Sequence, residues 1–513
     1  MVLAARLPDD LIDAVPGREY RARMGDGRIL YVHPSKLPVD QPCDWSNGAS
    51  PYLLAPMGII GLANSLRHRG LDVIGINYPM EVALNQGFRL VPWLRQQDDV
   101  RLVMIDLHWY EHAYGAMDVM RACKHVWPDV PVLLGGLTVS RFAEEIMSNF
   151  HAVDYVIRGD PELPTVQLAE GLVGGGLQPE TIANLSYRVD GQPVHNDRTY
   201  HSGPAEFEAL DFVDASFFVD ERRYAMFQSS DFGRLRGQWL CIGRGCHMSC
   251  GFCGGSKKAH LALSGQEAIL TRRPELVADD IARLAERGLH QVSLSHDPAV
   301  LGKPYWSKLF QAVQDRNVRI GIYNECWQLP GLDWLDALVE TFVTADSQLA
   351  FSPLSGNEEV RRLNGKFYSN ERLLQFLQAL KRHRLPLFIF FSLNLPGETE
   401  STLADTIAFA RQILSTYPPE LVTIANMHHT IDPESAFAVE PDRFGIEVQM
   451  RTFMHYYEYA HLTPYARPEA KVGRVRGFEM KPTGSRSLAR MAAMWDAAAT
   501  ELGPSCKQVP SVW

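Results

Sequence analysis

Short apolar runs alternate with amphipathic stretches in the first third of the chain. The predicted strands cover residues 52–56, 72–77, 101–106, 131–134 and 154–158, and the stretches between them have helical periodicity. Continuous apolar strands alternating with helices predict a parallel sheet covered on both faces, because right-handed crossovers place the helices there. We therefore expect a doubly wound α/β domain over residues 49–178, preceded by an N-terminal extension without sustained periodicity over residues 1–48.

A different pattern follows this domain. Residues 171–176 are rich in glycine, and Asp190-Gly191 separates two extended runs, as expected for a hairpin with a type I′ turn. Residues 198–235 are rich in aromatic and charged side chains, which suits a segment at the contact between two domains. We interpret residues 179–235 as a hairpin and linker.

The alternation of strands and helices resumes over residues 236–435. The predicted strands lie at residues 239–242, 291–295, 318–323, 349–351, 387–393 and 421–425. Most of them end in polar residues, such as His296-Asp297 and Asn324-Glu325. This pattern predicts an open, partial (β/α)6 barrel, and such barrels carry their chemistry at the carboxyl ends of the strands.

The last part, residues 436–513, is irregular and aromatic, and it closes with an amphipathic helix. That helix carries Leu488, Met491, Met494 and Trp495 on one face. We expect a small α-rich region that caps the mouth of the barrel. Ordinary core packing is the alternative, because aromatic residues at helical spacing are usually buried in a core.

Length and composition limit the possible functions. A chain of 513 residues exceeds one ordinary domain, so two or three domains are expected. The net charge is −10 and no long run of Lys and Arg is present, which argues against a nucleic-acid partner. The N-terminus lacks the apolar core of a signal peptide, and no apolar run has membrane-spanning length. We expect a cytoplasmic protein with no membrane partner.

Four of the eight cysteines lie in the stretch CIGRGCHMSCGFCGG, where Cys246, Cys250 and Cys253 form CxxxCxxC. Thiolates this close together can bind one iron–sulfur cluster, and three cysteines leave one iron of a [4Fe–4S] cube open. Phe252 and the following glycines suit a tight loop whose backbone a cofactor can approach. The alternatives are a zinc knuckle with Cys241 as fourth ligand, or buried cysteines without metal. The chain offers no second cysteine pair, and Cys241 lies in an apolar run that predicts a strand.

This stretch resembles the radical S-adenosylmethionine (SAM) superfamily, whose CxxxCxxC loop follows the first strand of a partial barrel. The phrases SPLSGNEEVRRLNGK and LPGETES resemble what that family carries at its fourth and fifth strands. The resemblance implies a [4Fe–4S] cluster whose open iron binds SAM, one-electron cleavage of SAM to a 5′-deoxyadenosyl radical, and an external electron donor of the flavodoxin or ferredoxin type. The SAM-binding residues that it implies are Phe252, Gly254, Gly255, Glu325, Ser352, Ser355 and Arg361. For the charged residues, capping of the next helix is the alternative role.

The doubly wound domain directly before the cysteine loop resembles the Rossmann-like cobalamin-binding domain of B12-dependent radical SAM enzymes. Ligands of such sheets bind beyond the carboxyl ends of the strands. The predicted cobalamin-binding residues are Pro56, Met57, Gly58, Asp106, His108, Trp109, Gly135, Gly136, Leu137, Thr138, Gly159, Asp160 and Glu162. A generic Rossmann-like module or a relic without ligand is the alternative, and the absence of G-x-G-x-x-G after the first strand argues against a dinucleotide.

B12 domains that ligate cobalt from below carry D-x-H-x-x-G after the first strand, whereas this chain has Pro56-Met57-Gly58-Ile59-Ile60. We therefore expect cobalamin with its base detached and no histidine beneath the cobalt. His108 and His112 are expected to have hydrogen-bonding or structural roles.

The function implied by the two resemblances is methylation of an unactivated carbon, or of phosphorus, in a small or medium-sized metabolite. One SAM would methylate the reduced cobalamin, and a second would supply the radical. Ring rearrangement, oxidative cyclisation and methylation without hydrogen abstraction stay open, and no catalytic residue is assigned. The alternative outside catalysis is an iron–sulfur electron-transfer or scaffold protein, in which a fourth cysteine ligand would be expected.

Overall fold

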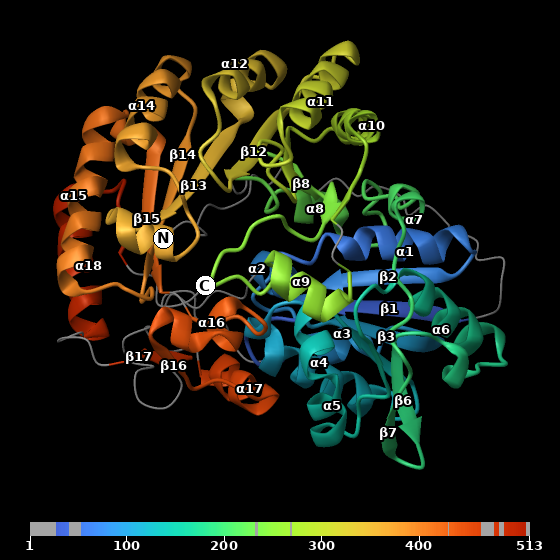
Figure 1. Ribbon diagram of the computed structural model, residues 1–513. Coiled ribbons are helices and arrows are strands. Elements are labelled where there is room, and N and C mark those ends of the chain that lie inside the picture. The colour runs from blue at the N-terminus through green and yellow to red at the C-terminus, as the bar shows by residue number, and fades with distance from the viewer. Residues whose placement is uncertain are drawn as a thin grey trace.

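Two large, mainly parallel sheets organise the computed structural model of the chain (Figure 1). The structure describes residues 27–40, 53–230, 234–266, 269–428, 430–462, 477–481 and 487–508. The first sheet and its helices form the first domain, and the second sheet with its helices forms the barrel domain. The described helices include none with the length and apolarity needed to cross a membrane.

The first sheet has seven strands in the order β2-β1-β3-β4-β5-β6-β7. Their bounds are β1 (Arg28–His33), β2 (Asp72–Asn77), β3 (Val100–Asp106), β4 (Val132–Gly135), β5 (Tyr155–Ile157), β6 (Leu185–Val189) and β7 (Gln192–His195). The strands from β2 to β5 are parallel, and β6 and β7 extend the sheet in antiparallel pairing. The strand order reverses between β1 and β3, which is where ligands of doubly wound sheets bind.

Helices cover both faces of this sheet. One face packs against α1 (Gly58–His68) and α6 (Glu162–Gly174), and the other packs against α4 (Ala113–Val126) and α5 (Leu137–Asn149). The alternation within β1 explains the two layers, because Tyr31 points to the first face and Val32 to the second. The shorter helices of this domain are α2 (Tyr78–Leu84) and α3 (Leu90–Leu94).

The sequence prediction for the first strand was wrong. Residues 53–56 form no strand, and Tyr52 lies outside the described residues. The central strand is β1, which falls inside the expected extension of residues 1–48 and pairs with both β2 and β3. Five of its six residues are buried. The run RILYVH was missed because no helical pattern follows it, so the first domain begins before residue 49.

The connection between the domains has the predicted hairpin and two short helices, α7 (Pro204–Glu208) and α8 (Glu221–Ala225). Asp190 and Gly191 both have positive φ, 49° and 78°, as the tight turn between β6 and β7 requires. After the hairpin, Phe212 packs into the barrel core and Phe217 into the core of the first domain. The aromatic segment therefore joins the two domains.

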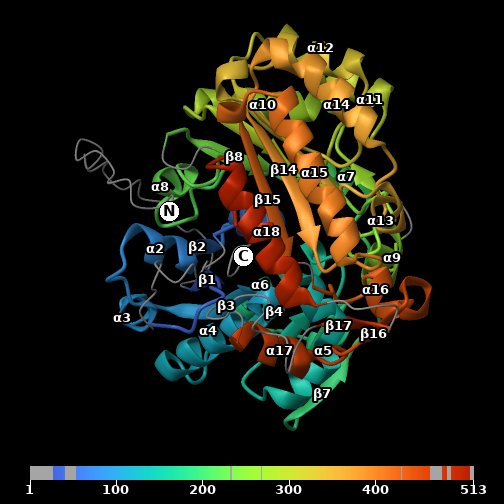
Figure 2. The ribbon, with the colours of Figure 1, turned by 90° about the vertical axis from the view of Figure 1, so that its left-hand side faces the viewer.

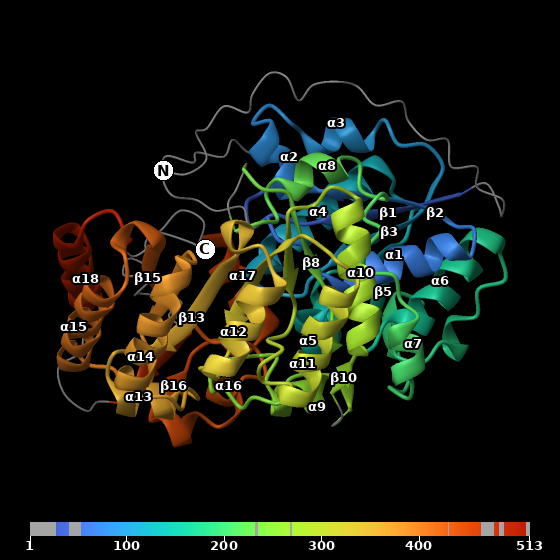
Figure 3. The ribbon, with the colours of Figure 1, turned by 90° about the horizontal axis from the view of Figure 1, so that it is seen from above.

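The second sheet has six parallel strands in the order β15-β14-β13-β12-β11-β8. Their bounds are β8 (Gly237–Leu240), β11 (Gln291–Leu294), β12 (Gly321–Cys326), β13 (Gln348–Leu354), β14 (Leu387–Leu393) and β15 (Val422–His428). The outer helices are α10 (Pro274–Glu286), α11 (Lys303–Asp315), α12 (Leu332–Thr341), α14 (Asn370–Leu380) and α15 (Glu400–Thr416), which follow one another along the outside of the sheet (Figure 3). The predicted open (β/α)6 barrel is confirmed.

The C-terminal region differs from the expected barrel cap. It comprises α16 (Ala436–Val439), β16 (Ile446–Val448), α17 (Phe453–Leu462), β17 (Phe478–Met480) and α18 (Leu488–Leu502). Helix α17 lies against α4 and α5 of the first domain (Figure 2), with Phe453 and Tyr456 buried in that core. Helix α18 packs on α15, and Trp495 is buried in the barrel core. Core packing, the alternative interpretation, therefore accounts for these aromatic residues, because both helices bury apolar faces against existing layers.

Residues after α18 pair with the free edge of β15. Ile424 N donates to the carbonyl of Ser505 at 2.7 Å, and Lys507 N donates to the carbonyl of Ile424 at 2.8 Å. An open barrel has exposed edge strands, and covering one of them satisfies backbone groups that could otherwise pair with another chain.

Candidate active site

A cavity of about 380 Å³ lies between the two domains and is called the interdomain cavity below. The predicted cobalamin residues that line it are Pro56, Met57, Gly58, Asp106, His108, Trp109, Gly135, Gly136, Leu137, Gly159, Asp160 and Glu162. The barrel domain contributes Cys241, Arg244, Gly255, His260, Ser295 and His296. The structure therefore brings together the carboxyl ends of the strands of the first sheet and the loop that carries the cysteines.

Thr138 is the predicted residue that does not line the interdomain cavity. It is 2% exposed, and its hydroxyl donates to the carbonyl of His108 at 3.0 Å. The strand-end position of Thr138 suggested ligand contact, but the first turn of α5 turns its side chain toward the protein. Thr138 holds the loop after β3 instead.

The strand-end glycines give the interdomain cavity the room that a large cofactor needs. A Cβ added at Gly135 would meet no atom within 4 Å, so a side chain there would project into open space. Gly136 has a φ of +123°, and a Cβ there would lie 2.7 Å from the backbone of His108. Much of the remaining wall is apolar, including Ile59, Leu62 and Leu263. An apolar wall with glycines at its base fits a bulky, partly apolar cofactor such as a corrin.

The two histidines of the loop after β3 occupy different environments. His108 lines the interdomain cavity, and burial lowers its pKa to about 4, so its imidazole is neutral near pH 7. His112, in the short 3-10 helix η3 (Tyr110–His112), is fully buried beneath the cavity. The absence of a histidine below the cobalt stays a prediction, as do the roles of both histidines.

The cysteine loop connects β9 (Gly243–Arg244) to α9 (Lys257–Ser264). Cys246, Cys250 and Cys253 are free thiols and partly exposed. Backbone N–H groups point at two of the sulfurs, from Met248 to Cys246 Sγ and from Gly255 to Cys253 Sγ, each at 3.3 Å. Hydrogen bonds of this kind stabilise cluster thiolates and tune cluster potentials, so the loop fits a three-cysteine [4Fe–4S] cluster.

Cys241 lies apart from this set. It is 9% exposed, belongs to the apolar core of the barrel, and its thiol donates to the carbonyl of Gly243 at 3.5 Å. Burial raises the pKa of this thiol. This environment suits a packed thiol better than a metal ligand.

Two further segments hold the cysteine loop, and sequence reasoning assigned neither of them. Gly365 has a φ of +97°, and a Cβ there would lie 2.8 Å from Cys250 Cα. Asp432 accepts a hydrogen bond from Gly254 N at 2.9 Å, and burial raises the pKa of Asp432 to about 7. Gly365 lies in the stretch SPLSGNEEVRRLNGK, whose resemblance to the radical SAM family was noted. Its close approach to Cys250 was not predicted. No local pattern marks Asp432.

The predicted SAM residues separate into accessible and buried positions. Glu325 and Ser352 alternate with buried core residues of β12 and β13, so both face the inside of the barrel. Glu325 accepts a hydrogen bond from the Tyr323 hydroxyl at 3.1 Å. Desolvation inside the barrel raises the pKa of Glu325. Gly255 lines the interdomain cavity. These three residues are accessible to a ligand.

Ser355 and Arg361 are not accessible, which corrects the expectation of direct contact. Both are 0% exposed. The Arg361 guanidinium, in α13 (Glu358–Leu363), donates to the carbonyls of Pro353, Ser355 and Tyr368 at 2.7 to 3.2 Å. Because its guanidinium binds carbonyls of its own loop, Arg361 stabilises this loop behind the strand ends.

Gly254 and Phe252 pack against other parts of the protein and do not line the interdomain cavity. A Cβ at Gly254 would lie 2.7 Å from the carbonyl oxygen of Pro433, so the glycine permits a close backbone approach there. Phe252 is half-buried and packs against Leu354, Val360 and Leu395. Both residues fix the path of the cysteine loop.

The inner face of the barrel carries aromatic residues that sequence reasoning did not single out. The rings of Trp239 and Tyr323 lie 5.7 Å apart in an edge-to-face arrangement, and those of Phe388 and Phe390 stack at 4.1 Å. All four are half-buried, whereas their neighbours on each strand are buried under the outer helices. Residues 387–391 of β14 are all apolar, so the sequence of this strand does not distinguish its inner face from its outer face.

An ion-pair network joins the two domains at the wall of the interdomain cavity. Arg244 pairs with Asp160 at 3.1 Å and with Glu162, and the Arg244 pKa is raised because these carboxylates outweigh its burial. Asp160 also accepts hydrogen bonds from Ser202 N and from Gln266 Nε2, both at 2.9 Å. Asp160 and Glu162, both predicted to bind cobalamin, therefore form ion pairs with Arg244 of the barrel domain.

Two family models match the chain in the order of its domains. The B12 binding domain matches residues 47–169, and the Radical SAM superfamily matches residues 240–410. No curated protein sequence matches the chain. The first match contains most of the residues that line the interdomain cavity from the first domain, and the second contains the cysteine loop.

Solved structures share this architecture at low identity. The radical S-adenosylmethionine methyltransferase TsrM from Kitasatospora setae, with tryptophan substrate and a SAM analog bound, gives a TM-score of 0.63 at 14% identity, covering 93% of this chain and 88% of that one. TsrM with cobalamin and a [4Fe–4S] cluster gives 0.59 at 13% identity over the same shares. The apo cobalamin-dependent SAM radical enzyme OxsB gives 0.52 at 13% identity, covering 76% of this chain and 52% of that one. At identities of 13–14%, this structural similarity shows a shared fold.

Proposed function

The chain is a cobalamin-dependent radical SAM enzyme, since it joins a B12 binding domain to a radical SAM domain, and we propose that it is a methyltransferase. Its cofactors are a [4Fe–4S] cluster, SAM and cobalamin. When bound, cobalamin supplies a carrier for a methyl group, and the cluster with SAM supplies a radical that activates the substrate. The proposed reaction is methylation of an unactivated carbon or of phosphorus in a small or medium-sized metabolite.

The observation that carries this proposal is the shared wall of the interdomain cavity. Gly255 follows the last cysteine by two residues, and it lines the same cavity as Gly135 at the end of β4. A methyl carrier on the first domain and a radical source on the barrel domain would therefore lie on opposite sides of one cavity. Holding reactive groups at close range and away from water is what a protein contributes to cofactor chemistry.

The residues around this space have complementary tasks in the proposed reaction. His108, neutral near pH 7, would offer a hydrogen bond to cobalamin without adding charge. Arg244 would fix the distance between the two halves through Asp160 and Glu162. Glu325 and Ser352 would bind polar groups of SAM or of the substrate.

The inner face of the barrel favours a substrate with a flat apolar part. Trp239, Tyr323, Phe388 and Phe390 offer aromatic surface there, and the carboxylate of Glu325 offers an acceptor for an ammonium or N–H group. TsrM was solved with tryptophan as substrate, which has both features. We propose an aromatic or heteroaromatic metabolite that carries an amine as the first class to test.

An external electron donor of the flavodoxin or ferredoxin type is part of the proposal, because reductive cleavage of SAM consumes an electron that the chain must receive. The test uses anaerobically reconstituted enzyme with a reductant and SAM labelled in its methyl group, offered to fractionated metabolites. Labelled product with S-adenosylhomocysteine and 5′-deoxyadenosine together is the expected result, because methyl donation leaves the first and radical formation leaves the second.

The other outcomes separate the alternatives. Deoxyadenosine without S-adenosylhomocysteine would indicate a cobalamin-dependent rearrangement or oxidation. S-adenosylhomocysteine alone would indicate methylation without hydrogen abstraction. Neither product from fully loaded enzyme would contradict the methyltransferase proposal and favour an iron–sulfur electron-transfer or scaffold role.

A further inference from the structure

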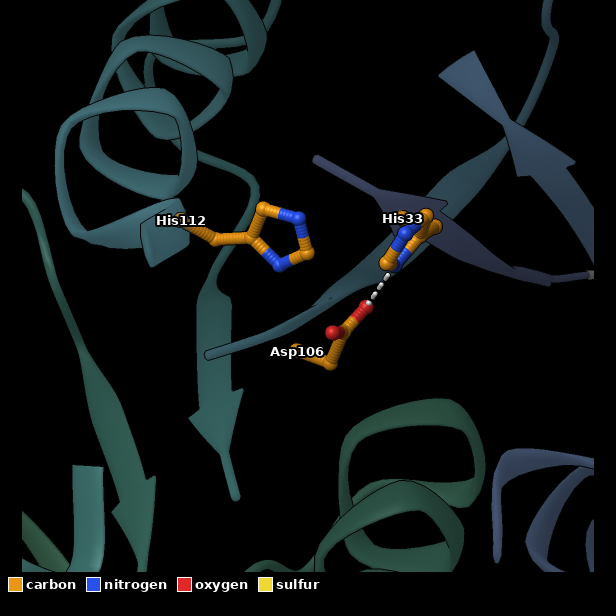
Figure 4. A group of neighbouring side chains, drawn as sticks. All are labelled: His33, Asp106 and His112. Atoms are coloured by element: carbon orange, nitrogen blue, oxygen red, sulfur yellow. Dashed lines mark hydrogen bonds and ion pairs between the residues drawn. The ribbon is translucent and has the colours of Figure 1, made fainter. Parts of the chain in front are cut away.

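We propose that His33, Asp106 and His112 form a binding site for one divalent metal ion beneath the interdomain cavity, separate from the iron–sulfur cluster. Each of the three residues offers one ligand atom, and these atoms all lie within 4.8 Å of one another (Figure 4). The two imidazole rings lie edge to face, with the Asp106 carboxylate beside them. The ring centroids of His33 and His112 are 5.0 Å apart at an interplanar angle of 86°.

Three different elements bring this group together. His33 is the last residue of β1, Asp106 is the last residue of β3, and His112 ends the 3-10 helix that follows. Parallel strands that are neighbours in a sheet end at the same edge, so β1 and β3 place the first two ligands side by side. The following helix then turns His112 back toward them.

The group is buried, and it contains polar atoms whose hydrogen-bonding capacity is unused. His33 and His112 are 0% exposed and Asp106 is 8% exposed. His33 Nδ1 lies 2.8 Å from Asp106 Oδ1, but His33 Nε2 and Asp106 Oδ2 have no hydrogen-bond partner among the described residues. A buried polar atom without a partner costs about 1–3 kcal/mol. A cation bound by these atoms would remove that cost.

Two titratable groups outside the site, Lys36 and His108, interact with His112. Lys36 is the nearby cation and is itself buried, with a pKa lowered to about 8. Glu111 faces Lys36 and partly offsets its charge. The Asp106 carboxylate is thus the acidic group placed to meet an added cation.

Tyr31 contacts the same carboxylate oxygen as His33. Its hydroxyl donates to Asp106 Oδ1 at 2.6 Å. Carboxylate ligands of metals are commonly oriented by such hydrogen bonds from residues that do not touch the metal. Tyr31 would therefore be a positioning residue of the metal site.

Two imidazole nitrogens and one carboxylate oxygen suit Zn²⁺ or Fe²⁺ better than Mg²⁺ or Ca²⁺, which prefer oxygen ligands. Bonds of about 2.1 Å in a tetrahedral site place the ligand atoms about 3.4 Å apart, so movements of an ångström or less would complete the present arrangement. Asp106 also lines the interdomain cavity, which provides an entry path and room for a water as fourth ligand. The ion would connect β1 to the loop after β3, directly beneath the interdomain cavity.

The test measures metal content and Zn²⁺ affinity in the full-length protein, purified anaerobically without chelator. Cys246→Ala/Cys250→Ala/Cys253→Ala protein serves as background, so that cluster iron does not contribute. We expect about one Zn²⁺ or Fe²⁺ per chain by elemental analysis. His33→Ala and His112→Ala should weaken Zn²⁺ binding by more than about tenfold, and Tyr31→Phe, which keeps the packing, by about tenfold. His151→Ala, an exposed histidine of the same domain, should bind as the background protein does.

A second measurement guards against variants that fold poorly. Asp106→Asn keeps the shape of the side chain, and in cobalamin-free protein Co²⁺ should give ligand-field absorption bands that are lost in this variant. Zn²⁺ binding that is equal in background, His33→Ala and Asp106→Asn proteins would overturn the proposal and leave water as the partner of these atoms. The test requires no methyl transfer, so its failure would leave the proposed function unaffected.

Discussion

Arg244 of the radical SAM domain forms an ion pair with Glu162 of the B12 binding domain. Arg244 precedes Cys246 by two residues, and Glu162 begins α6 directly after the loop that follows β5 and lines the interdomain cavity. The pair therefore links the cysteine loop to the opposite wall of this cavity by two short segments of chain. Any change in the separation of the two domains has to break or stretch this contact.

Arg244→Met should weaken that link. The change leaves Asp160 and Glu162, whose side chains are 4% and 10% exposed, without their cationic partner. Loss of one member of a buried pair typically costs about 3–5 kcal/mol. We expect a lower unfolding temperature and weaker cobalamin retention, measured by calorimetry and by absorbance after gel filtration. Arg244→Met/Glu162→Gln should recover part of the loss, and no recovery would argue against the ion pair as the cause.

Replacing any of Cys246, Cys250 and Cys253 by Ala should abolish the [4Fe–4S] cluster, whereas Cys241→Ala should keep it. The physical reason is the placement of Cys241 in the barrel core, away from the loop that presents the other thiols. Iron and sulfide analysis of anaerobically reconstituted proteins provides the measurement. A cluster that is lost in Cys241→Ala protein alone would show that the three-ligand assignment is wrong.

Gly135→Leu should fold and yet fail to bind cobalamin. A Cβ at Gly135 meets no atom within 4 Å, so a larger side chain would fit the apo protein but occupy the interdomain cavity. Gly174→Leu is the matched control, because Gly174 also has open space around it and lies on the exposed end of α6. Cobalamin titration followed by absorbance should separate the two variants. Normal binding by Gly135→Leu protein would place the cofactor elsewhere.

Asp297 should make stability depend on pH in a defined window. Burial raises its pKa to about 6, only partly opposed by hydrogen bonds from Ala299 and Trp327, whereas an unfolded chain has an ordinary value of about 3.9. Between these values the folded protein holds a proton that the unfolded chain has lost, so the free energy of unfolding falls as pH rises, by up to roughly 3 kcal/mol.

Asp297→Asn cannot titrate and isolates this effect. The difference in unfolding temperature between the original protein and Asp297→Asn should move in favour of the variant as pH increases from 4 to 7. Differential scanning calorimetry at several pH values provides the measurement. A difference that is constant with pH, or that moves the opposite way, would contradict the assigned pKa.

The sequence was sufficient to predict the features that depend on local pattern. The strands of the barrel were located to within a few residues, because each is a short apolar run followed by polar residues. Nine of the twelve predicted cobalamin residues that line the interdomain cavity follow strands that were predicted at the right place, from the rule that strand ends carry ligands. Pro56, Met57 and Gly58 line it too, although the strand predicted before them is absent. The core position of Cys241 followed from its apolar neighbours.

Features that depend on long-range packing were not predicted. The family resemblance implied a SAM contact for Arg361, yet its burial depends on how α13 folds back over its own loop. Asp432 reaches Gly254 from 178 residues away, and no local pattern indicates that contact. The aromatic face of α17 was assigned to the barrel mouth because sequence periodicity reveals a buried face without identifying the partner that buries it.

The position of β1 determines where the B12 binding domain can be divided from its neighbours. The family match begins at residue 47, but β1 at Arg28–His33 is the strand that connects β2 to β3. A fragment that begins at the family match would have two strand edges facing an empty slot at the middle of its sheet. It would also lack His33, and exposed edges of this kind favour association with other chains. Recombinant fragments of the domain therefore have to start ahead of Arg28.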